Sequence, residues 1–141
     1  MVYLSLGSNL GDRDAYLEAA CRVMERLLRV ELKRSRVIET EAVGFEGPAF
    51  LNMAVAFEAP GWLTPEGLLD FCQSIEMELG REPHQIEYNA DGTRLYRSRT
   101  IDIDILKYDE LEISTPRLVI PHPQVLSRPF VAELLKDLET I

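Results

Sequence analysis

Two carboxylates stand one residue apart in the segment of the chain that is best suited to chemistry, Arg-Thr-Ile-Asp-Ile-Asp-Ile over residues 99–105. Side chains of a β-strand alternate between its faces, so Asp102 and Asp104 share one face, with Cα atoms about 7 Å apart. Two carboxylates on one face repel each other unless a cation lies between them. They are hard oxygen ligands of the type that Mg²⁺ prefers when it also binds phosphates. The pattern therefore favours a magnesium site.

Three arginines, Arg94, Arg97 and Arg99, come just before these acids. Guanidinium groups beside a carboxylate-bound metal stabilise the charge of a phosphoryl-transfer transition state. The alternative is that Asp102 and Asp104 only keep the outer face of a half-solvated sheet soluble. The neighbouring arginines favour phosphoryl transfer.

A second group of polar residues comes later, with His122 between two prolines and with Arg117 and Arg128 near it. Taken alone, His122 is better explained as a turn histidine that is hydrogen-bonded to backbone, but the two arginines make an anion site more credible. The earlier run Gly7-Ser8-Asn9 follows a predicted strand as a turn, and the chain has neither a G-x-x-x-x-G-K-[ST] nor a G-x-G-x-x-G pattern. The commonest nucleotide-binding loops are therefore excluded.

The bulk composition limits the class of protein. A chain of 141 residues with 46% hydrophobic side chains predicts one folded domain, 1–141. Its net charge of −9 argues against a nucleic-acid or anionic-membrane surface, and no stretch approaches the ~20 apolar residues that span a bilayer. No basic leader segment opens the sequence, so we expect a cytoplasmic protein. We also expect a monomer whose partners are small molecules. The two cysteines, Cys21 and Cys72, are predicted to be buried core thiols.

The hydrophobic pattern predicts the elements that must position these residues. Long irregular stretches are expected at 41–48 and 81–98, and loops of the second length inside a domain are usually functional. A first helix is expected to begin at the N-cap Asp12 and to include Val30, the last residue of its apolar stripe. A second is expected to begin at Thr64-Pro65 and to stop at Gly80. The strands are predicted at 1–6, 33–40, 51–58, 100–108 and 118–120, and a last helix at 129–138.

This order, β-α-β-β-α-β, predicts an α+β fold of the ferredoxin-like type. In that arrangement an antiparallel sheet is covered by helices on one face. The other face is then free to hold ligands, with the long loops beside it.

Several motifs together resemble the 6-hydroxymethyl-7,8-dihydropterin pyrophosphokinase family, over residues from about 3 to about 135. The order and spacing of the motifs make the likeness specific, although each piece alone is weak. They are Gly7-Ser8-Asn9-Leu10-Gly11, Phe50-Leu51-Asn52, Gln73 with Glu76, Gly80-Arg81, the segment from Arg99 to Asp104, Pro121-His122 and Arg128-Pro129-Phe130.

The resemblance implies roles for these residues. ATP would be bound by Gln73, Glu76, Arg117, His122 and Arg128, while Asp102 and Asp104 would bind two Mg²⁺ ions and Arg81 and Arg99 would assist transfer. The pterin would stack between Phe50 and Phe130, with hydrogen bonds from Asn52 and from the loop that contains Thr40, Val43 and Gly44. The chemistry implied is attack of the pterin hydroxymethyl oxygen on the β-phosphorus of ATP, with AMP released.

The sequence departs from the family pattern around its loops. Tyr96-Arg97-Ser98-Arg99 stands where many members have Arg-Trp-Gly-Pro-Arg, and Glu41-Ala42 stands where Pro is common. Among the three arginines, Arg99→Ala is predicted to slow turnover most. Two other functions compete: another Mg-dependent nucleotidyl or glycosyl transferase, which would not need the pterin-binding residues, and a ferredoxin-like regulatory module, which would tolerate loss of either aspartate.

Overall fold

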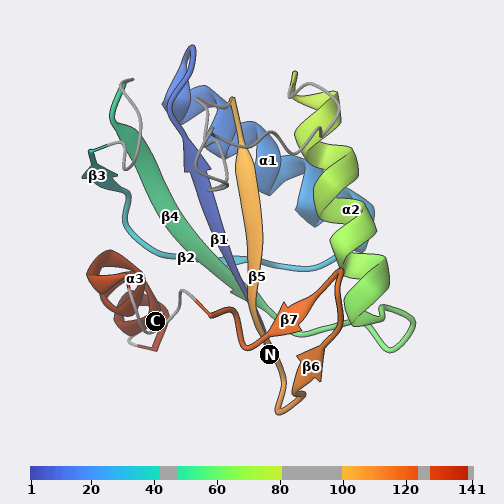
Figure 1. Ribbon diagram of the computed structural model, residues 1–141. Helices are drawn as coiled ribbons and strands as arrows, with labels where there is room; N and C mark the ends of the chain where they lie inside the picture. Colours follow the sequence, from blue (N-terminus) through green and yellow to red (C-terminus); the bar gives the residue numbers. More distant parts are fainter. Residues whose placement is uncertain (42–47, 81–99, 124–127, 140–141) are drawn as a thin grey trace, which may run out of the picture.

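The computed structural model describes residues 1–41, 48–80, 100–123 and 128–139 (Figure 1). Within these ranges three helices and seven strands follow one another along the chain. In order they are β1 (Val2–Ser8), α1 (Arg13–Leu28), β2 (Lys33–Arg34), β3 (Ile38–Thr40), β4 (Phe50–Phe57), α2 (Pro65–Glu78), β5 (Asp102–Tyr108), β6 (Ile113–Ser114), β7 (Val119–Ile120) and α3 (Pro129–Glu139).

The main sheet has the strand order β2-β4-β1-β5, and β3 pairs with β4 beside β2. All of its pairs are antiparallel. β4 and β1 are the central strands, while β5 forms one edge and β2 with β3 forms the other. This is the predicted α+β, ferredoxin-like arrangement. β6 and β7 form a separate two-stranded ladder that lies next to β5.

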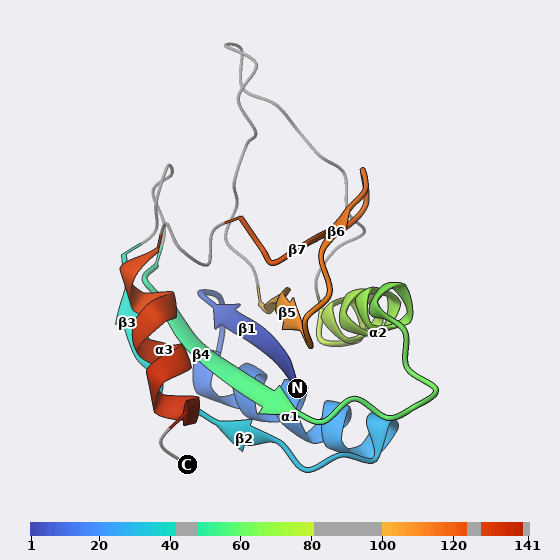
Figure 2. The ribbon, with the colours of Figure 1, turned by 90° about the horizontal axis from the view of Figure 1, so that it is seen from below.

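The helices α1 and α2 cover one face of the sheet, as predicted, and the main core lies between them and the strands. Alternate residues of the central strands point into it, for example Leu4 and Leu6 of β1 and Val55 of β4, each fully buried. In Figure 2 the first helix lies on one side of the strands and the β6–β7 ladder on the other. The two faces of the sheet are therefore in different environments.

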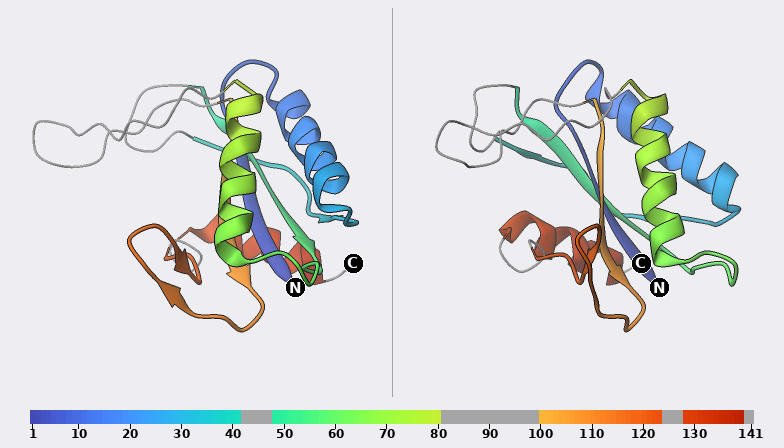
Figure 3. Two further views of the ribbon diagram at one scale, coloured as in Figure 1. Left: turned by 90° about the vertical axis from the view of Figure 1, so that its right-hand side faces the viewer. Right: turned by 45° about the vertical axis from the view of Figure 1, so that its right-hand side comes forward.

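The third helix, α3, packs on the opposite face, over one end of β4 (Figure 3). Its Leu134 and Leu138 are buried against Ala54 and Ala56, whose small side chains let the helix approach the strand. The face that the sequence predicts to be free is thus partly covered. The part of this face beyond α3 carries the polar residues described below.

Local sequence signals set the ends of the helices. The Asp12 side chain accepts a hydrogen bond from the backbone N–H of Ala15, and the Thr64 side chain accepts one from Gly67, so both predicted N-caps are confirmed. After α2, Gly80 has a φ of 99°, a conformation that glycine adopts at little cost. The described residues include no helix that is both long and apolar enough to cross a bilayer.

The structure also differs from the predicted elements. The first helix ends at Leu28, because Arg29 takes a left-handed conformation, so Val30 lies beyond it. The predicted strand 33–40 is broken into two, because Ser35 bonds to β4 through its hydroxyl, which accepts from the N–H of Ala54. β6 was not predicted, since two residues carry no periodicity.

Both cysteines are free and buried, as predicted. Burial is the main cause that raises the pKa of the Cys21 thiol to about 11, and it also raises the pKa of Cys72. A thiol with a raised pKa is protonated at neutral pH and is a poor nucleophile. Thiol catalysis is therefore disfavoured at both positions.

Candidate active site

The alternation of β5 directs its two carboxylates away from the main core. Ile103 and Ile105 are buried against α1 and α2, whereas Asp102 and Asp104 are half-buried on the other face. The register places them opposite β1, with Asp102 next to Gly7 and Asp104 next to Ser5. The predicted sharing of one face is confirmed.

One row across the sheet connects the two halves of the candidate site. Gly7 in β1 pairs with Asn52 of β4 on one side and with Asp102 of β5 on the other. Neighbouring strands lie about 4.8 Å apart, so the backbones of Asn52 and Asp102 are about 10 Å apart. The hydrogen bonds of the sheet therefore hold the Asn52 amide and the Asp102 carboxylate at a fixed separation, with only β1 between them. The amide suits the edge of a heterocycle, and the carboxylate suits a cation.

Gly7, in the middle of this row, has no side chain that projects from the surface of the sheet. A Cβ at that position would lie 3.3 Å from Oδ1 of Asn52 and 3.5 Å from Cδ1 of Phe50. Both side chains therefore lie over the backbone of β1, in space that any larger residue would fill. β1 therefore forms the bottom of the candidate site, and β4 supplies the Phe50 ring and the Asn52 amide.

Asn52 is fixed by bonds to the edge strand β3. Its side-chain Nδ2 donates to Oγ1 of Thr40 at 2.8 Å and to the carbonyl oxygen of Ile38 at 3.2 Å, and the residue is only 7% exposed. A buried amide with these bonds has a single orientation. Thr40 and Asn52, both predicted to bind the pterin, are therefore in direct contact.

Phe130, the second predicted stacking residue, lies at the start of α3. It is partly buried and packs against the small cluster formed by Leu106 and Val131, and against the cluster formed by Ala54, Ala56, Leu134 and Leu138. Its helix lies on the same face of the sheet as Asn52 and the two aspartates. The structure thus brings an aromatic residue from the end of the chain to the face that carries Phe50.

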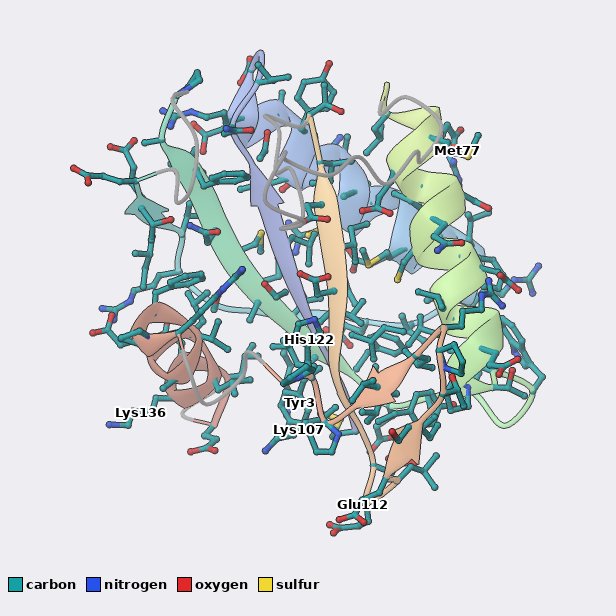
Figure 4. All side chains as sticks on the ribbon, in the orientation of Figure 1. Tyr3, Met77, Lys107, Glu112, His122 and Lys136 are labelled. Carbon is teal, nitrogen blue, oxygen red and sulfur yellow. The ribbon has the colours of Figure 1, made fainter. Side chains whose placement is uncertain are left out.

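His122 follows β7 and is held against β5. Its backbone N–H donates to the carbonyl oxygen of Leu106 at 3.0 Å, and its Nε2 lies 3.9 Å from Oδ1 of Asp104. Figure 4 draws His122 in front of β5, near Tyr3 and Lys107. Burial is the largest cause that lowers the pKa of His122, Arg128 lowers it further, and Asp102 acts in the opposite direction. A neutral imidazole next to a carboxylate is thus favoured at neutral pH.

Arg117 lies on the turn between β6 and β7, on the side of the site near α2. Its guanidinium donates to the carboxylate of Asp70, an exposed residue of α2. Gln73 lies one turn further along the same helix, and residues three apart are neighbours on a helix surface. Arg117 and Gln73, both predicted to contact ATP, are therefore at the same edge of the molecule.

Glu76 differs from the other predicted ATP ligands because it is buried. It is 6% exposed, and its Oε2 accepts a hydrogen bond of 3.0 Å from the backbone N–H of Ile103, between the two aspartates. Sequence reasoning missed this contact, since no spacing rule links a helix residue to a strand 27 positions later.

Two residues that were not assigned roles hold the segment in front of Phe50. Asn9 Nδ2 donates to the carbonyl oxygen of Pro48 at 3.1 Å, and Arg13 Nη1 donates to that of Ala49 at 2.8 Å. Asn9 is fully buried and belongs to the Gly7-Ser8-Asn9 turn, so the motif itself was a signal. Arg13 carries no such signal.

Several predicted site residues lie outside the described residues. They are Val43, Gly44, Arg81 and Arg99, together with Arg94, Tyr96 and Arg97, where the sequence departs from the family pattern.

The donors present suit a cation that is also bound by a substrate. Among the described residues no group of three or more His, Cys, Asp and Glu side chains forms a metal cage. Mg²⁺ is typically held by one or two carboxylates together with substrate phosphates, and Asp102 and Asp104 are half-buried carboxylates on an accessible face. This donor set fits magnesium carried with a nucleotide.

Comparison with known proteins agrees with this arrangement. The family model described as 7,8-dihydro-6-hydroxymethylpterin-pyrophosphokinase matches residues 3–140. A 2-amino-4-hydroxy-6-hydroxymethyldihydropteridine pyrophosphokinase of Porphyromonas gingivalis is 42% identical over 139 residues, covering 97% of this chain and 89% of its own. Proteins of the same name from Bacillus subtilis and Aquifex aeolicus are 39% and 38% identical, covering 98% of this chain in each case and 77% and 79% of their own. The chain therefore belongs to the 7,8-dihydro-6-hydroxymethylpterin-pyrophosphokinase family.

Proposed function

We propose that this protein transfers a pyrophosphoryl group from ATP to the hydroxymethyl oxygen of 6-hydroxymethyl-7,8-dihydropterin, in folate biosynthesis. The oxygen of the pterin attacks the β-phosphorus, the bond to the α-phosphate oxygen breaks, and AMP leaves; the hydroxyl proton is released. The observation that carries the proposal is the row formed by Asn52, Gly7 and Asp102, which sets an amide and a carboxylate about 10 Å apart. That span suits a flat bicyclic substrate whose reactive arm points at the phosphates.

The pterin end of the site consists of Phe50, Asn52, Thr40 and Phe130. Hydrogen bonds to Thr40 and to the Ile38 carbonyl hold the Asn52 side chain in place. Asn52 can therefore hydrogen-bond to the edge of the pterin ring without losing further conformational entropy on binding. Phe50 lies over Gly7, and Phe130 lies on the same face of the sheet. The two rings are proposed to stack on the pterin, with Val43 and Gly44 as further contacts.

The nucleotide end consists of Arg117, His122, Arg128 and Gln73. Arg117 and Gln73 share one edge of the molecule, and His122 lies beside Asp104. A neutral His122 donates a hydrogen bond to a phosphate oxygen without adding a charge that competes with a cation. Arg117 exchanges Asp70 for a phosphate when ATP binds. Arg81 and Arg99 are proposed to stabilise the charge of the transition state.

Asp102 and Asp104 are the residues proposed to hold two Mg²⁺ ions with ATP. Bound there, magnesium would neutralise the triphosphate and the charge that develops on the leaving group. The work of the chain itself is to keep the two carboxylates on one face and at one spacing. Strand β5 does so through its pairing with β1.

The proposal extends to the state of the enzyme. Residues 1–141 act as one domain, and the protein works in the cytoplasm as a monomer on small molecules. Light scattering of the purified protein, with and without ATP, measures its mass, and a dimer would contradict the monomer.

The experiment is AMP formation from ATP with Mg²⁺, in the presence and absence of 6-hydroxymethyl-7,8-dihydropterin. We expect AMP only with the pterin, and none above background with Asp102→Ala. The matched control is Asp14→Asn, which removes an exposed carboxylate in the first turn of α1 and leaves turnover unchanged. Pterin-independent AMP, or no AMP from a folded protein, would move the assignment to another Asp-x-Asp transferase.

A further inference from the structure

A buried carboxylate lies directly behind the two aspartates. Glu76, near the end of α2, is 6% exposed and accepts a hydrogen bond of 3.0 Å from the backbone N–H of Ile103. Ile103 stands between Asp102 and Asp104 in sequence, and its own side chain points into the main core. The bond therefore attaches to a peptide N–H that lies between the two carboxylates.

The position of this bond follows from the sheet. Among the described residues β5 is an edge strand: one side pairs with β1, and no described strand of the main sheet pairs with its other side. The N–H groups on that outer side need acceptors from elsewhere. Glu76 supplies an acceptor at Ile103, in the middle of the segment that carries the aspartates.

Burying a carboxylate costs hydration energy, and a hydrogen bond to it recovers part of that cost. The neighbours of Glu76 on the same face of α2 are apolar, with Leu68, Cys72 and Ile75 each 1% exposed. A glutamine or a serine would accept the same bond with less loss of hydration energy. A carboxylate accepts the N–H bond about twice as strongly as a neutral group, so it holds the peptide more rigidly.

We propose that Glu76 is a positioning residue, which fixes the backbone of β5 between Asp102 and Asp104 and so sets the spacing of the two carboxylates. It acts through the Ile103 peptide and not by touching ATP. This inference rests on the proposed function, because the spacing matters only if both aspartates bind magnesium with the nucleotide. Partners that orient metal ligands in this way typically change metal affinity or activity by 10- to 100-fold when they are removed.

The test uses three variants of the full chain. Glu76→Ala removes the acceptor, and Glu76→Gln keeps an amide oxygen in its place. Ile75→Ala is the matched control, because it removes a buried side chain one residue earlier on α2 without removing a bond to β5. Thermal unfolding of all three, followed by circular dichroism, identifies the temperature range in which each is folded.

Hydrogen exchange of the Ile103 amide, measured by NMR without substrates, is the first readout. We expect exchange at least about tenfold faster in Glu76→Ala than in the wild type, relative to the amides of β4. Glu76→Gln, which accepts the same bond more weakly, is expected to fall between the wild type and Glu76→Ala. Ile75→Ala is expected to stay within about threefold of the wild type on the same scale. Unchanged exchange in Glu76→Ala overturns the proposal.

The second readout is the Mg²⁺ concentration that gives half-maximal AMP formation at saturating ATP. We expect about a tenfold rise in Glu76→Ala, a smaller rise in Glu76→Gln and little change in Ile75→Ala. A similar rise in Ile75→Ala, or a loss of ATP affinity in Glu76→Gln with Ile103 exchange unchanged, overturns the positioning role in favour of general packing or direct contact with ATP. A wild type that makes no AMP contradicts the proposed function instead, and the exchange measurement separates the two failures.

Discussion

The two faces of the sheet are built from the same strands but serve different purposes. The face under α1 and α2 is lined by residues such as Leu4, Leu6 and Val55, all fully buried. The opposite face carries Asn52, the two aspartates of β5 and a glycine floor, and α3 covers only one end of it. A strand period of two lets one face supply stability while the other supplies chemistry. Substitutions on the two faces should therefore separate the two properties.

The largest expected effect is on the open face. Asp104→Asn keeps the size of the side chain but removes a charge that is proposed to bind magnesium. We expect turnover to fall on the order of 10³-fold, with the free energy of unfolding changed by about 0.5 kcal/mol or less. Steady-state kinetics and urea unfolding measure the two quantities. A large loss of stability with normal turnover per folded molecule would reverse the assignment of the faces.

The covered face should give the opposite result. Leu6→Ala in β1 removes a fully buried side chain from the main core. We expect the free energy of unfolding to fall by about 2–5 kcal/mol, because a cavity remains where contacts were lost. KM for the pterin should stay near the wild-type value at temperatures where the variant is folded. Activity lost in proportion to Asp104→Asn would show that the faces are coupled.

Gly7 lies in the middle of the open face. A methyl group added there should weaken the binding of the pterin and leave the binding of ATP unchanged. Gly7→Ala puts a Cβ 3.3 Å from Oδ1 of Asn52, which must then shift, and 3.5 Å from the Phe50 ring, an ordinary van der Waals contact. We expect KM for the pterin to rise about tenfold, a free energy of about 1.4 kcal/mol, with little change in KM for ATP. Gly61→Ala is the control, because a Cβ at Gly61 has no atom within 4 Å.

A smaller effect is expected at the rim of the open face. Arg13→Met removes the bond from Nη1 to the Ala49 carbonyl and the ion pair with Glu39, which together steady the segment before Phe50. We expect KM for the pterin to rise a few-fold, consistent with the loss of about 1 kcal/mol of hydrogen bonding. Arg22→Met, which removes only an exposed ion pair within α1, should leave KM unchanged.

The smallest effect concerns a carboxylate away from both faces. Hydrogen bonds from Arg22 and then Arg34 lower the pKa of Glu18, so its ionised form stabilises the folded state. That contribution is present above the ordinary pKa of a glutamate and is lost as the pH falls through the lowered value. Because Glu18 is exposed, Glu18→Gln should cost only about 0.5 kcal/mol at pH 7. Urea unfolding at pH 7 and at pH 3 should show the difference between variant and wild type disappear in acid.

Local patterns predicted much of the fold and the open face. Alternation in β5 placed Asp102 and Asp104 on one face, and Thr64 before a proline placed the start of α2. These features depend on a few neighbouring residues. Family resemblance, and not periodicity, singled out Phe50, Asn52 and Phe130.

Features that depend on distant partners could not be predicted. The Ser35 hydroxyl breaks a strand because Ala54 of β4 lies opposite, and α3 packs across Ala54 and Ala56 because their side chains are small. Neither partner is adjacent in sequence. The contact between Glu76 and Ile103 could not be predicted for the same reason. An acidic residue on an apolar helix face gives no indication of which peptide N–H it will bind.

In the described part of the chain, each edge of the sheet has a peptide N–H that is bonded to an acidic side chain. At β5 the Glu76 carboxylate takes the N–H of Ile103, and at the opposite edge, between β2 and β3, Asp137 of α3 accepts from the N–H of Arg36 at 2.8 Å. Open strand edges pair with strands of other molecules and so promote aggregation. A peptide N–H that is already bonded to a carboxylate is unavailable for such pairing. The negative charge of the carboxylate also repels another copy of this chain, whose net charge is −9. The same two bonds therefore remove one free donor from each edge, and we expect them to disfavour pairing of these edges with strands of other molecules.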